Sequence, residues 1–257
     1  MVDILQVRDL KVWFPIKKGV FARTVGHVKA VDGVSFDLHR GETLGVVGES
    51  GSGKSTIARV VMGLQKATSG EVGLKGRAAM VFQDPLGSLN PRMTIRATLE
   101  ETMRVFRLKS EDLSRNDFRR ETQDAGELLA LVGIDETALD KYPHEFSGGQ
   151  RQRICIARAI AAKPDLLICD EAVSALDLSI RAQILDLLED LKRKLGLSLL
   201  FITHDLGVVQ HIADRILVMN RGKIIEEGPS GQVLRAPREE YTRYLISSVP
   251  KIGKPLT

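Results

Sequence analysis

Four residues near position 50 have the types and the spacing of a phosphate-binding loop: Gly48, Gly53, Lys54 and Ser55. Glycines let the backbone turn its N–H groups toward an anion, a lysine can reach the β- and γ-phosphates, and a serine hydroxyl can bind Mg²⁺. The sequence therefore predicts a nucleotide site formed by Gly48, Ser50, Gly51, Ser52, Gly53, Lys54, Ser55 and Thr56, with Ser55 also binding the metal.

The segments on either side of this loop decide between a binding site and a glycine-rich turn that matches by chance. Residues 44–47 are an apolar run, which predicts a buried strand, and residues 56–62 predict a helix. A strand, a loop and a helix in this order are the context that the pattern requires, and the start of the helix adds partial positive charge. The context favours the binding site.

Further polar residues each follow a short apolar run: Gln83, the pair Asp170 and Glu171, and His204. Ligands of parallel sheets bind at the carboxyl ends of the strands, so we expect these side chains and the phosphate loop at one edge. Asp170 and Gln83 are then candidate Mg²⁺ ligands, Glu171 a candidate base for the attacking water, and His204 a candidate phosphate contact. A helix cap, a strand end and a structural histidine are the alternatives.

The remaining patterns predict an α/β fold with a largely parallel sheet covered on both faces. We expect strands at residues 4–7, 34–38, 78–82, 166–169, 199–202, 215–219 and 223–226, the last two joined by a tight hairpin turn. We expect helices at residues 103–107, 117–131, 136–139, 149–162 and 180–195, and one capped by Asp205 that ends near Ala213. Residues 15–24 predict an exposed hairpin or loop.

Composition places few limits on the partners of the chain. Its 257 residues carry a formal net charge of +4, and the basic residues are scattered. Cys155 and Cys169 lie in apolar segments, so we expect buried thiols and no disulfide. Neither a signal segment nor an apolar run long enough to span a bilayer is present, so we expect a cytoplasmic protein that reaches a membrane only through a partner.

The stretch at residues 146–153 contains Ser147-Gly-Gly-Gln150, a second helix start that can bind an anion. One chain with one nucleotide does not need two such sites. Together with the phosphate loop, Gln83, residues 166–171, residues 174–177 and His204, this stretch makes the chain resemble the ABC-type ATPase family. The resemblance covers essentially the whole chain in the order and spacing of the family.

That resemblance implies a P-loop NTPase fold with a mainly parallel central sheet, an N-terminal antiparallel β subdomain and a helical insertion. Residues 1–257 would form a single ABC ATPase domain, with a helical subdomain at about 90–163 and a C-terminal helical tail at about 228–257. It also implies ATP and Mg²⁺ bound in a head-to-tail dimer. Glu171 would be the general base, His204 would hold the water and the γ-phosphate, and Gln83 would couple to the membrane partner. Ser147, Gly148, Gly149, Gln150 and Asp177 would act across the dimer interface.

Three segments narrow the resemblance to importers of di- and oligopeptides and of nickel: residues 83–94, 170–177 and 241–250. The expected partners are a like or identical ATPase subunit, two membrane permeases and, indirectly, a substrate-binding protein, at the cytoplasmic face of the inner membrane. No nucleic-acid partner is expected. We expect a peptide cargo, with nickel as the alternative cargo. A soluble ABC ATPase that is not part of a transporter is a more distant alternative for the class of protein. A homodimer and a heterodimer stay open.

The sequence departs from the family pattern at two places, and one segment is expected to contact the permeases. The aromatic residue that usually stacks on adenine falls near Val25, and Phe21, Trp13 or Phe14 could replace it, so the base contact is left open. No cysteine follows Cys169, so no C-terminal iron–sulfur cluster is expected. Residues 83–96 should form the permease contact, with Leu86, Leu89, Met93 and Ile95 exposed; packing of these four on the helical insertion is the alternative.

Overall fold

The computed structural model describes residues 2–19, 23–110 and 124–248 of the chain. The chain forms two compact units. The first contains Met1–Lys75 and Ser198–Thr257, and the second contains Gly76–Leu197. Residues 90–163, for which a helical subdomain is expected, fall within the range of the second unit. No helix among the described residues is long and apolar enough to cross a membrane.

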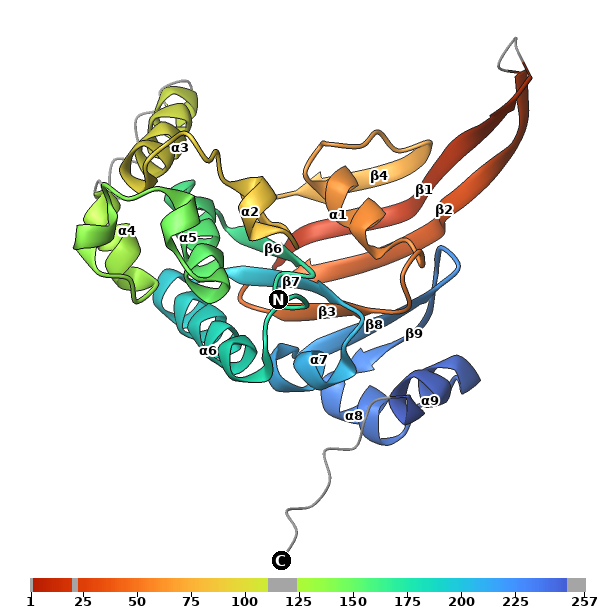
Figure 1. Cartoon of the computed structure of the whole chain (residues 1–257). Coiled ribbons are helices and arrows are strands. Elements are labelled where there is room, and N and C mark those ends of the chain that lie inside the picture. Colours follow the sequence, from red (N-terminus) through yellow and green to blue (C-terminus); the bar gives the residue numbers. More distant parts are fainter. Residues whose placement is uncertain (1, 20–22, 111–123, 249–257) are drawn as a thin grey trace, which may run out of the picture. The chain divides into compact units, whose positions relative to one another are not determined.

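An antiparallel sheet in the first unit has the strand order β2-β1-β4, with β1 at Asp3–Lys18, β2 at Arg23–His39 and β4 at Ser69–Leu74. The first two strands are much longer than predicted, because they continue through the expected hairpin as a projecting arm (Figure 1). Along the arm, the apolar face leaves the core: Val12 and Val31 are buried, whereas Phe14 and Val28 are 40% and 55% exposed. The N-terminal antiparallel sheet is confirmed.

A second sheet in this unit has the strand order β7-β3-β8-β9, with β7 at Ser198–Thr203, β3 at Thr43–Val47, β8 at Arg215–Asn220 and β9 at Lys223–Pro229. Strand β3 runs parallel to both β7 and β8, and β9 is antiparallel to β8. Every residue of β3 and β7 is buried, as expected for parallel strands covered on both faces. Arg221 and Gly222 form the predicted tight turn, both with positive φ.

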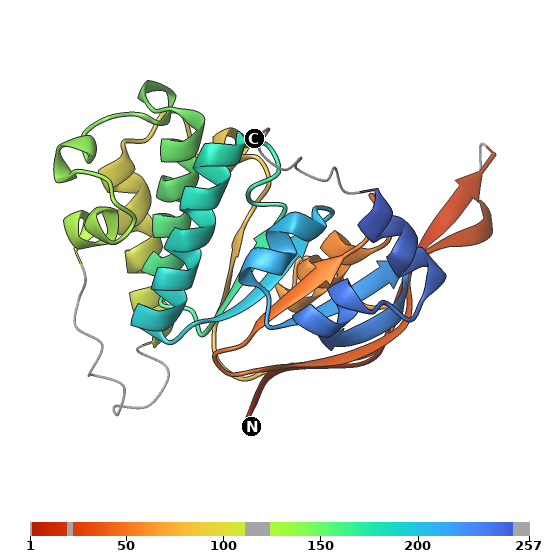
Figure 2. The same cartoon turned by 90° about the horizontal axis from the view of Figure 1, so that it is seen from below.

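The described part of the first unit contains four helices: α1 at Lys54–Val61, α7 at Leu206–Ile212, α8 at Ser230–Arg235 and α9 at Glu240–Ser247. Helix α7 packs on β3 and β7, and α8 packs on β8 and β9. Figure 2 shows α7, α8 and α9 in blue beside these strands. The carboxylate of Asp205 accepts hydrogen bonds from the N–H groups of Gly207 and Val208, which confirms the predicted cap.

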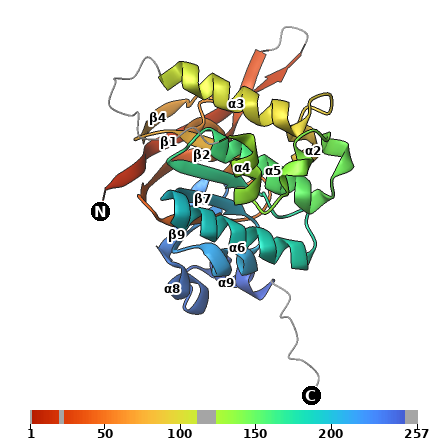
Figure 3. The same cartoon turned by 90° about the vertical axis from the view of Figure 1, so that its left-hand side faces the viewer.

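The second unit contains the parallel pair β5 at Ala78–Val81 and β6 at Leu166–Asp170. Its helices are α2 at Pro85–Ser88, α3 at Ile95–Ser110, α4 at Ala125–Leu131, α5 at Gly148–Ala161 and α6 at Leu178–Leu195, with 3-10 turns at Glu136–Ala138 and Pro143–Glu145. Helix α5 contacts each of the other four helices and β5, so it is the centre of this unit (Figure 3).

Three expectations for the second unit are wrong in detail. Strand β5 ends at Val81, so Phe82 does not end a buried strand but is 38% exposed. Helix α3 begins at Ile95 rather than Met103. The helix expected at 117–131 begins at Ala125 within the described residues, and its residues 117–123 lie outside them.

The expected exposure of the segment after β5 is also partly wrong. Leu89 and Ile95 are buried, at 3% and 0% exposure, while Leu86 is 51% exposed and Met93 is half-buried. Helix α5 explains the burial: the thiol of Cys155 and the guanidinium of Arg158 donate to the carbonyl oxygens of Pro85 and Ser88. These bonds hold α2 against α5, and Leu89 follows α2 directly. The packing alternative is therefore correct for Leu89 and Ile95.

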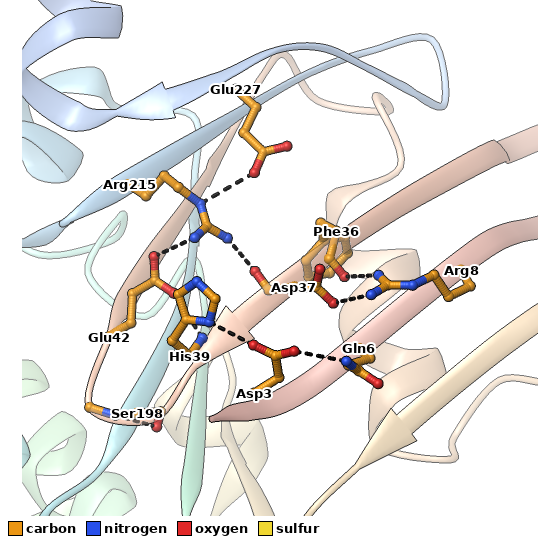
Figure 4. Close-up of polar contacts among 11 residues, drawn as sticks. Asp3, Gln6, Arg8, Phe36, Asp37, His39, Glu42, Ser198, Arg215 and Glu227 are labelled. Carbon is orange, nitrogen blue, oxygen red and sulfur yellow. Dashed lines mark hydrogen bonds and ion pairs between the residues drawn. The ribbon is translucent and has the colours of Figure 1, made fainter. Parts of the chain in front are cut away.

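A cluster of charged residues connects the strands of the first unit (Figure 4). The guanidinium of Arg215 on β8 pairs with Glu42 at 2.9 Å and with Glu227 on β9 at 3.3 Å, and it also donates to the carbonyl oxygen of Asp37 on β2. Because Glu42 directly precedes β3, one side chain links both sheets of the unit. Arg8 extends the cluster through its 2.6 Å ion pair with Asp37.

Candidate active site

The phosphate loop, residues 48–56, follows β3 in the first unit and includes the start of α1, which begins at Lys54. Gly48 and Gly53 have φ of 152° and 106°. A Cβ at Gly48 would lie 2.2 Å from the carbonyl oxygen of Met219, and one at Gly53 would lie 2.1 Å from that of Ala30. No other residue type fits either position without moving backbone. The glycines are therefore required by close approach as well as by conformation.

The ammonium of Lys54 lies inside this loop. It donates to the carbonyl oxygens of Gly48 at 2.7 Å and Glu49 at 2.8 Å, and to the hydroxyl of Ser52 at 3.3 Å. Lys54 is only 4% exposed. Helix α1 begins at this residue, with no acidic side chain in its first turn to reduce the positive end of the helix dipole. The loop thus combines a desolvated cation with a helix N-terminus, which is suited to bind phosphate.

Neighbouring strands place His204 at the same edge as the phosphate loop. In the parallel register, Val47 at the end of β3 is opposite Thr203 at the end of β7. Gly48 and His204 are the next residues of the two strands, so both leave the sheet at one edge. His204 is exposed. For these two features, the predicted shared edge is confirmed.

The second unit brings together Gln83, Asp170 and Glu171 in the same way. Val81 of β5 is opposite Cys169 of β6. Asp170 is the last residue of β6, Glu171 follows it directly, and Gln83 comes two residues after the end of β5. Asp170 is 8% exposed, and Gln83 is exposed. Because these residues and the phosphate loop belong to different units, the expectation that all of them form one site stays a prediction.

Glu171 has an unusual backbone conformation that the sequence pattern did not predict. Its φ is +51°, in the left-handed region that non-glycine residues seldom adopt. Its carbonyl oxygen accepts hydrogen bonds from the hydroxyl of Ser174 at 2.9 Å and from the N–H of Ser174 at 3.1 Å. Such strain is concentrated at functional sites, where the surrounding structure maintains it.

The second predicted anion site lies at the start of α5, where Ser147 and Gln150 form a capping box. The N–H of Gln150 donates to the Ser147 hydroxyl at 3.3 Å, and the N–H of Ser147 donates to the Gln150 side-chain oxygen at 3.0 Å. Gly148 has open space around it, whereas a Cβ at Gly149 would lie 2.6 Å from Cγ2 of Ile180. Gly149 therefore lets α6 approach α5.

Asp177, which was expected to act across a dimer interface, is the N-cap of α6. Its carboxylate accepts from the N–H of Ile180 at 3.0 Å and from the hydroxyl of Ser179 at 2.8 Å. These two donors lower the pKa of Asp177. The carboxylate is exposed and ionised at neutral pH, so it is available to a partner.

Tyr241 on α9 contacts the phosphate loop, and sequence reasoning did not find it. Its hydroxyl oxygen accepts a 3.2 Å hydrogen bond from the N–H of Glu49, across 192 positions of the chain. No spacing rule links positions so far apart. The contact follows from the packing of α9, and no pattern of neighbouring residues in the sequence predicts that packing.

The base-stacking residue that the sequence left open is still open. Val25 is 57% exposed and Phe14 is 40% exposed on the arm, and Phe21 lies outside the described residues. Trp13 is engaged locally, since its indole N–H donates to Asp32 at 3.1 Å and the ammonium of Lys29 lies 4.5 Å from its ring centre.

Both cysteines are buried and unpaired, as predicted. Burial raises the pKa of Cys155 to about 11 and that of Cys169 to about 12. Neither thiol is therefore reactive at neutral pH.

Comparison with known proteins gives the family. The ABC transporter family model matches residues 31–174, which contain the phosphate loop, the start of α5 and the end of β6. The chain belongs to the ABC transporter family. Among its relatives, an oligopeptide transport ATP-binding protein of Salmonella typhimurium is 49% identical and the match covers 96% of this chain and 78% of the relative. A counterpart from Lactococcus lactis is 45% identical, covering 98% and 82%. A dipeptide transport ATP-binding protein of Escherichia coli is 46% identical, covering 97% and 77%.

Solved structures agree with this membership. A dimeric ATP-binding cassette in a post-hydrolysis state with ADP and Pi is 27% identical, with a TM-score of 0.70, covering 88% of this chain and 98% of that one. The ADP form of another ATP-binding cassette has a TM-score of 0.75 at 24% identity, covering 96% and 100% of the two chains, and supports the fold. The predicted P-loop NTPase fold is confirmed, and this ABC protein is an ATPase of that fold.

Proposed function

We propose that this ABC protein binds and hydrolyses ATP to energise an importer of di- and oligopeptides. The observation that carries the proposal is the phosphate loop with the buried ammonium of Lys54 at its centre. The relatives described above are peptide-transport subunits over almost all of this chain, which supports peptide rather than nickel as the cargo. The same similarity does not favour a soluble ABC protein of another kind.

In this proposal the backbone N–H groups of the phosphate loop and Lys54 bind the β- and γ-phosphates. Mg²⁺ would be held by the Ser55 hydroxyl, the Asp170 carboxylate and the Gln83 side-chain oxygen. These donors fit the ion, because Mg²⁺ prefers hard oxygen ligands and keeps several waters. When bound, the ion neutralises charge on the phosphates.

Glu171 is the proposed general base, and His204 the residue that orients the γ-phosphate and the water. The left-handed backbone of Glu171 supports this role, because such strained conformations are concentrated at functional sites. The carboxylate accepts the proton of the attacking water, and hydrolysis releases ADP and phosphate.

We further propose a head-to-tail dimer, in which Ser147, Gly148, Gly149 and Gln150 of one subunit contact the ATP held by the other. Two observations support it. Helix α5 is long and begins with a glycine pair, and the relative with ADP and Pi is dimeric. Asp177 lies at the neighbouring start of α6, where its ionised carboxylate can accept hydrogen bonds from the second subunit.

The permease contact is proposed at the segment after β5, with residues that differ from the original expectation. Phe82 and Leu86 are exposed and Met93 is half-buried, so these three form the apolar part of the surface. Leu89 and Ile95 are excluded by their burial. The two permeases would hold the protein at the cytoplasmic face of the inner membrane and connect it to the substrate-binding protein.

Uptake by cells tests the cargo. Cells that lack the gene would be complemented with the parent protein or with Glu171→Gln, and uptake of a labelled tripeptide and of radioactive nickel would be measured. We expect the parent protein to restore peptide uptake and the variant to fail. Restoration of nickel uptake alone would replace the peptide proposal by the nickel alternative, and restoration by both proteins would exclude Glu171 as the base.

A further inference from the structure

The peptide group between Gly48 and Glu49 is held from both ends. Its carbonyl oxygen, on Gly48, accepts from the ammonium of Lys54 at 2.7 Å, and its N–H, on Glu49, donates to the hydroxyl of Tyr241 at 3.2 Å. One end of this peptide is therefore one of the three acceptors that hold the Lys54 ammonium, and the other end is bound to the C-terminal part of the chain.

Tyr241 is itself held in a defined position by α9. The carboxylate of Glu226, which is 8% exposed, accepts from the N–H groups of Arg238 at 2.8 Å and Glu239 at 3.2 Å. Burial works against its ionisation, but these N–H groups keep the pKa of Glu226 below its usual value. The start of α9 is thus fixed to β9 by an ionised group.

The apolar face of α9 fixes the other side of the helix. Tyr241, Leu245 and Ile246 pack against a buried cluster that includes Val47 and Val218. Val47 is the last residue of β3 and directly precedes the phosphate loop. The ring of Tyr241 is therefore packed beside the strand that carries the loop, while its hydroxyl reaches the loop itself.

We propose that Tyr241 is a positioning residue for the phosphate loop, whose hydroxyl fixes the Gly48–Glu49 peptide and through it the place of the Lys54 ammonium. Without the hydroxyl, this peptide can rotate, and part of the binding energy of ATP must then be used to order the loop. The C-terminal segment that contains α9 thereby sets the affinity for ATP. The proposal depends on the proposed function of the loop as the ATP site.

A pair of tyrosines on α9 gives a matched test. Tyr241→Phe removes only the hydroxyl and keeps the packed ring, and Tyr244→Phe removes the same group from a side chain that is 58% exposed. The full chain would be titrated with a non-hydrolysable ATP analogue by calorimetry, and its melting temperature would be measured without nucleotide. We expect Tyr241→Phe to weaken binding about three- to tenfold, the range for one lost hydrogen bond, and Tyr244→Phe to leave it unchanged.

Two further variants separate the possible failures. Leu245→Ala loosens α9 and so measures the effect of helix stability on the melting temperature. If Tyr241→Phe lowered the melting temperature as much as Leu245→Ala does, its loss of affinity would reflect a loosened helix, and the role of the hydroxyl would be overturned. Parent-like affinity of Tyr241→Phe would overturn it as well. Lys54→Ala tests the underlying site: if this variant binds the analogue normally, the ATP site itself is wrong, whatever Tyr241→Phe does.

Discussion

At the scale of single residues, Lys54 is the cation on which the proposed phosphate binding depends. Its ammonium is almost fully buried and is surrounded by oxygens of the loop. Lys54→Ala should weaken binding of an ATP analogue by about tenfold or more, because a charge-assisted interaction in a dehydrated site is lost. Isothermal titration would measure this, with Lys223→Ala at an exposed position of β9 as the control. Unchanged affinity would show that phosphate binds elsewhere.

The proposed role of Glu171 as general base can be tested by removing its charge. Glu171→Gln keeps the shape of the side chain and removes its basicity, so ATP binding should persist while steady-state turnover falls by about 100-fold or more. Phosphate release measures the rate, and Glu100→Gln on the exposed face of α3 is the control. Turnover equal to that of the parent protein would contradict the catalytic role.

Residue types and spacing were sufficient to predict the phosphate loop, the Asp205 cap and the turn at Arg221 and Gly222, because each depends on a few neighbouring positions. They were not sufficient for the left-handed φ of Glu171. That conformation is set by the turn between β6 and α6, which is closed by hydrogen bonds from Ser174. The contact of Tyr241 with Glu49 could not be predicted from spacing either, since it depends on packing across the first unit.

At the scale of elements, the segment around α2 shows where pattern reasoning fails. A turn-rich composition was interpreted as exposure, but hydrogen bonds from α5 hold α2 in this segment, and Leu89 and Ile95 are buried. Strands β3, β6, β7 and β8 and helices α5 and α6 were predicted well because their apolar runs or helical periodicity are continuous. Strand β4 was not predicted, and α3 was predicted only in part. The length of the β1–β2 arm was missed because its outer residues lack the regular burial that the pattern assumes.

Leu86 and Leu89 give a direct test of the permease surface. Leu86→Ser should leave the melting temperature and ATP binding nearly unchanged and release the subunit from its permeases in co-purification, because this side chain is 51% exposed. Leu89→Ser should instead lower the melting temperature, since it puts a hydroxyl into a site with 3% exposure. If Leu86→Ser still co-purified with the permeases and still supported transport, this segment would be excluded as the permease contact.

Arg215 allows a prediction about the connection between the two sheets of the first unit. The side chains of Arg215 and Glu42 are 19% and 11% exposed, so Arg215→Met leaves Glu42 poorly solvated and unpaired. We expect a loss of about 2–3 kcal/mol in the free energy of unfolding, below the 3–5 kcal/mol of a fully buried pair because water reaches both groups. Urea unfolding would measure it, and Arg193→Met at an exposed pair is the control. Equal free energies of unfolding for Arg215→Met and the parent protein would contradict the role of Arg215 in connecting the two sheets.

At the scale of the whole molecule, the proposed site needs two copies of the chain or one copy and a homologue. Glu171→Gln with ATP should elute as a dimer in size-exclusion chromatography with light scattering, because unhydrolysed ATP holds the two subunits together. Adding Gly149→Ala should return it to a monomer, since the new methyl group would displace Ile180 and the start of α5. A monomeric Glu171→Gln protein at saturating ATP would favour a heterodimer as the working form.

The two backbone hydrogen bonds of Gly222 offer a way to observe nucleotide binding. Its N–H donates to the carbonyl oxygen of Ser52 in the phosphate loop, and its carbonyl oxygen accepts from the N–H of Asp32 on β2. A ligand that orders the loop should therefore slow deuterium uptake at the amides of Gly222 and Asp32. Both would act as reporters of occupancy, although one lies 170 positions after the loop residue it bonds and the other 20 positions before it.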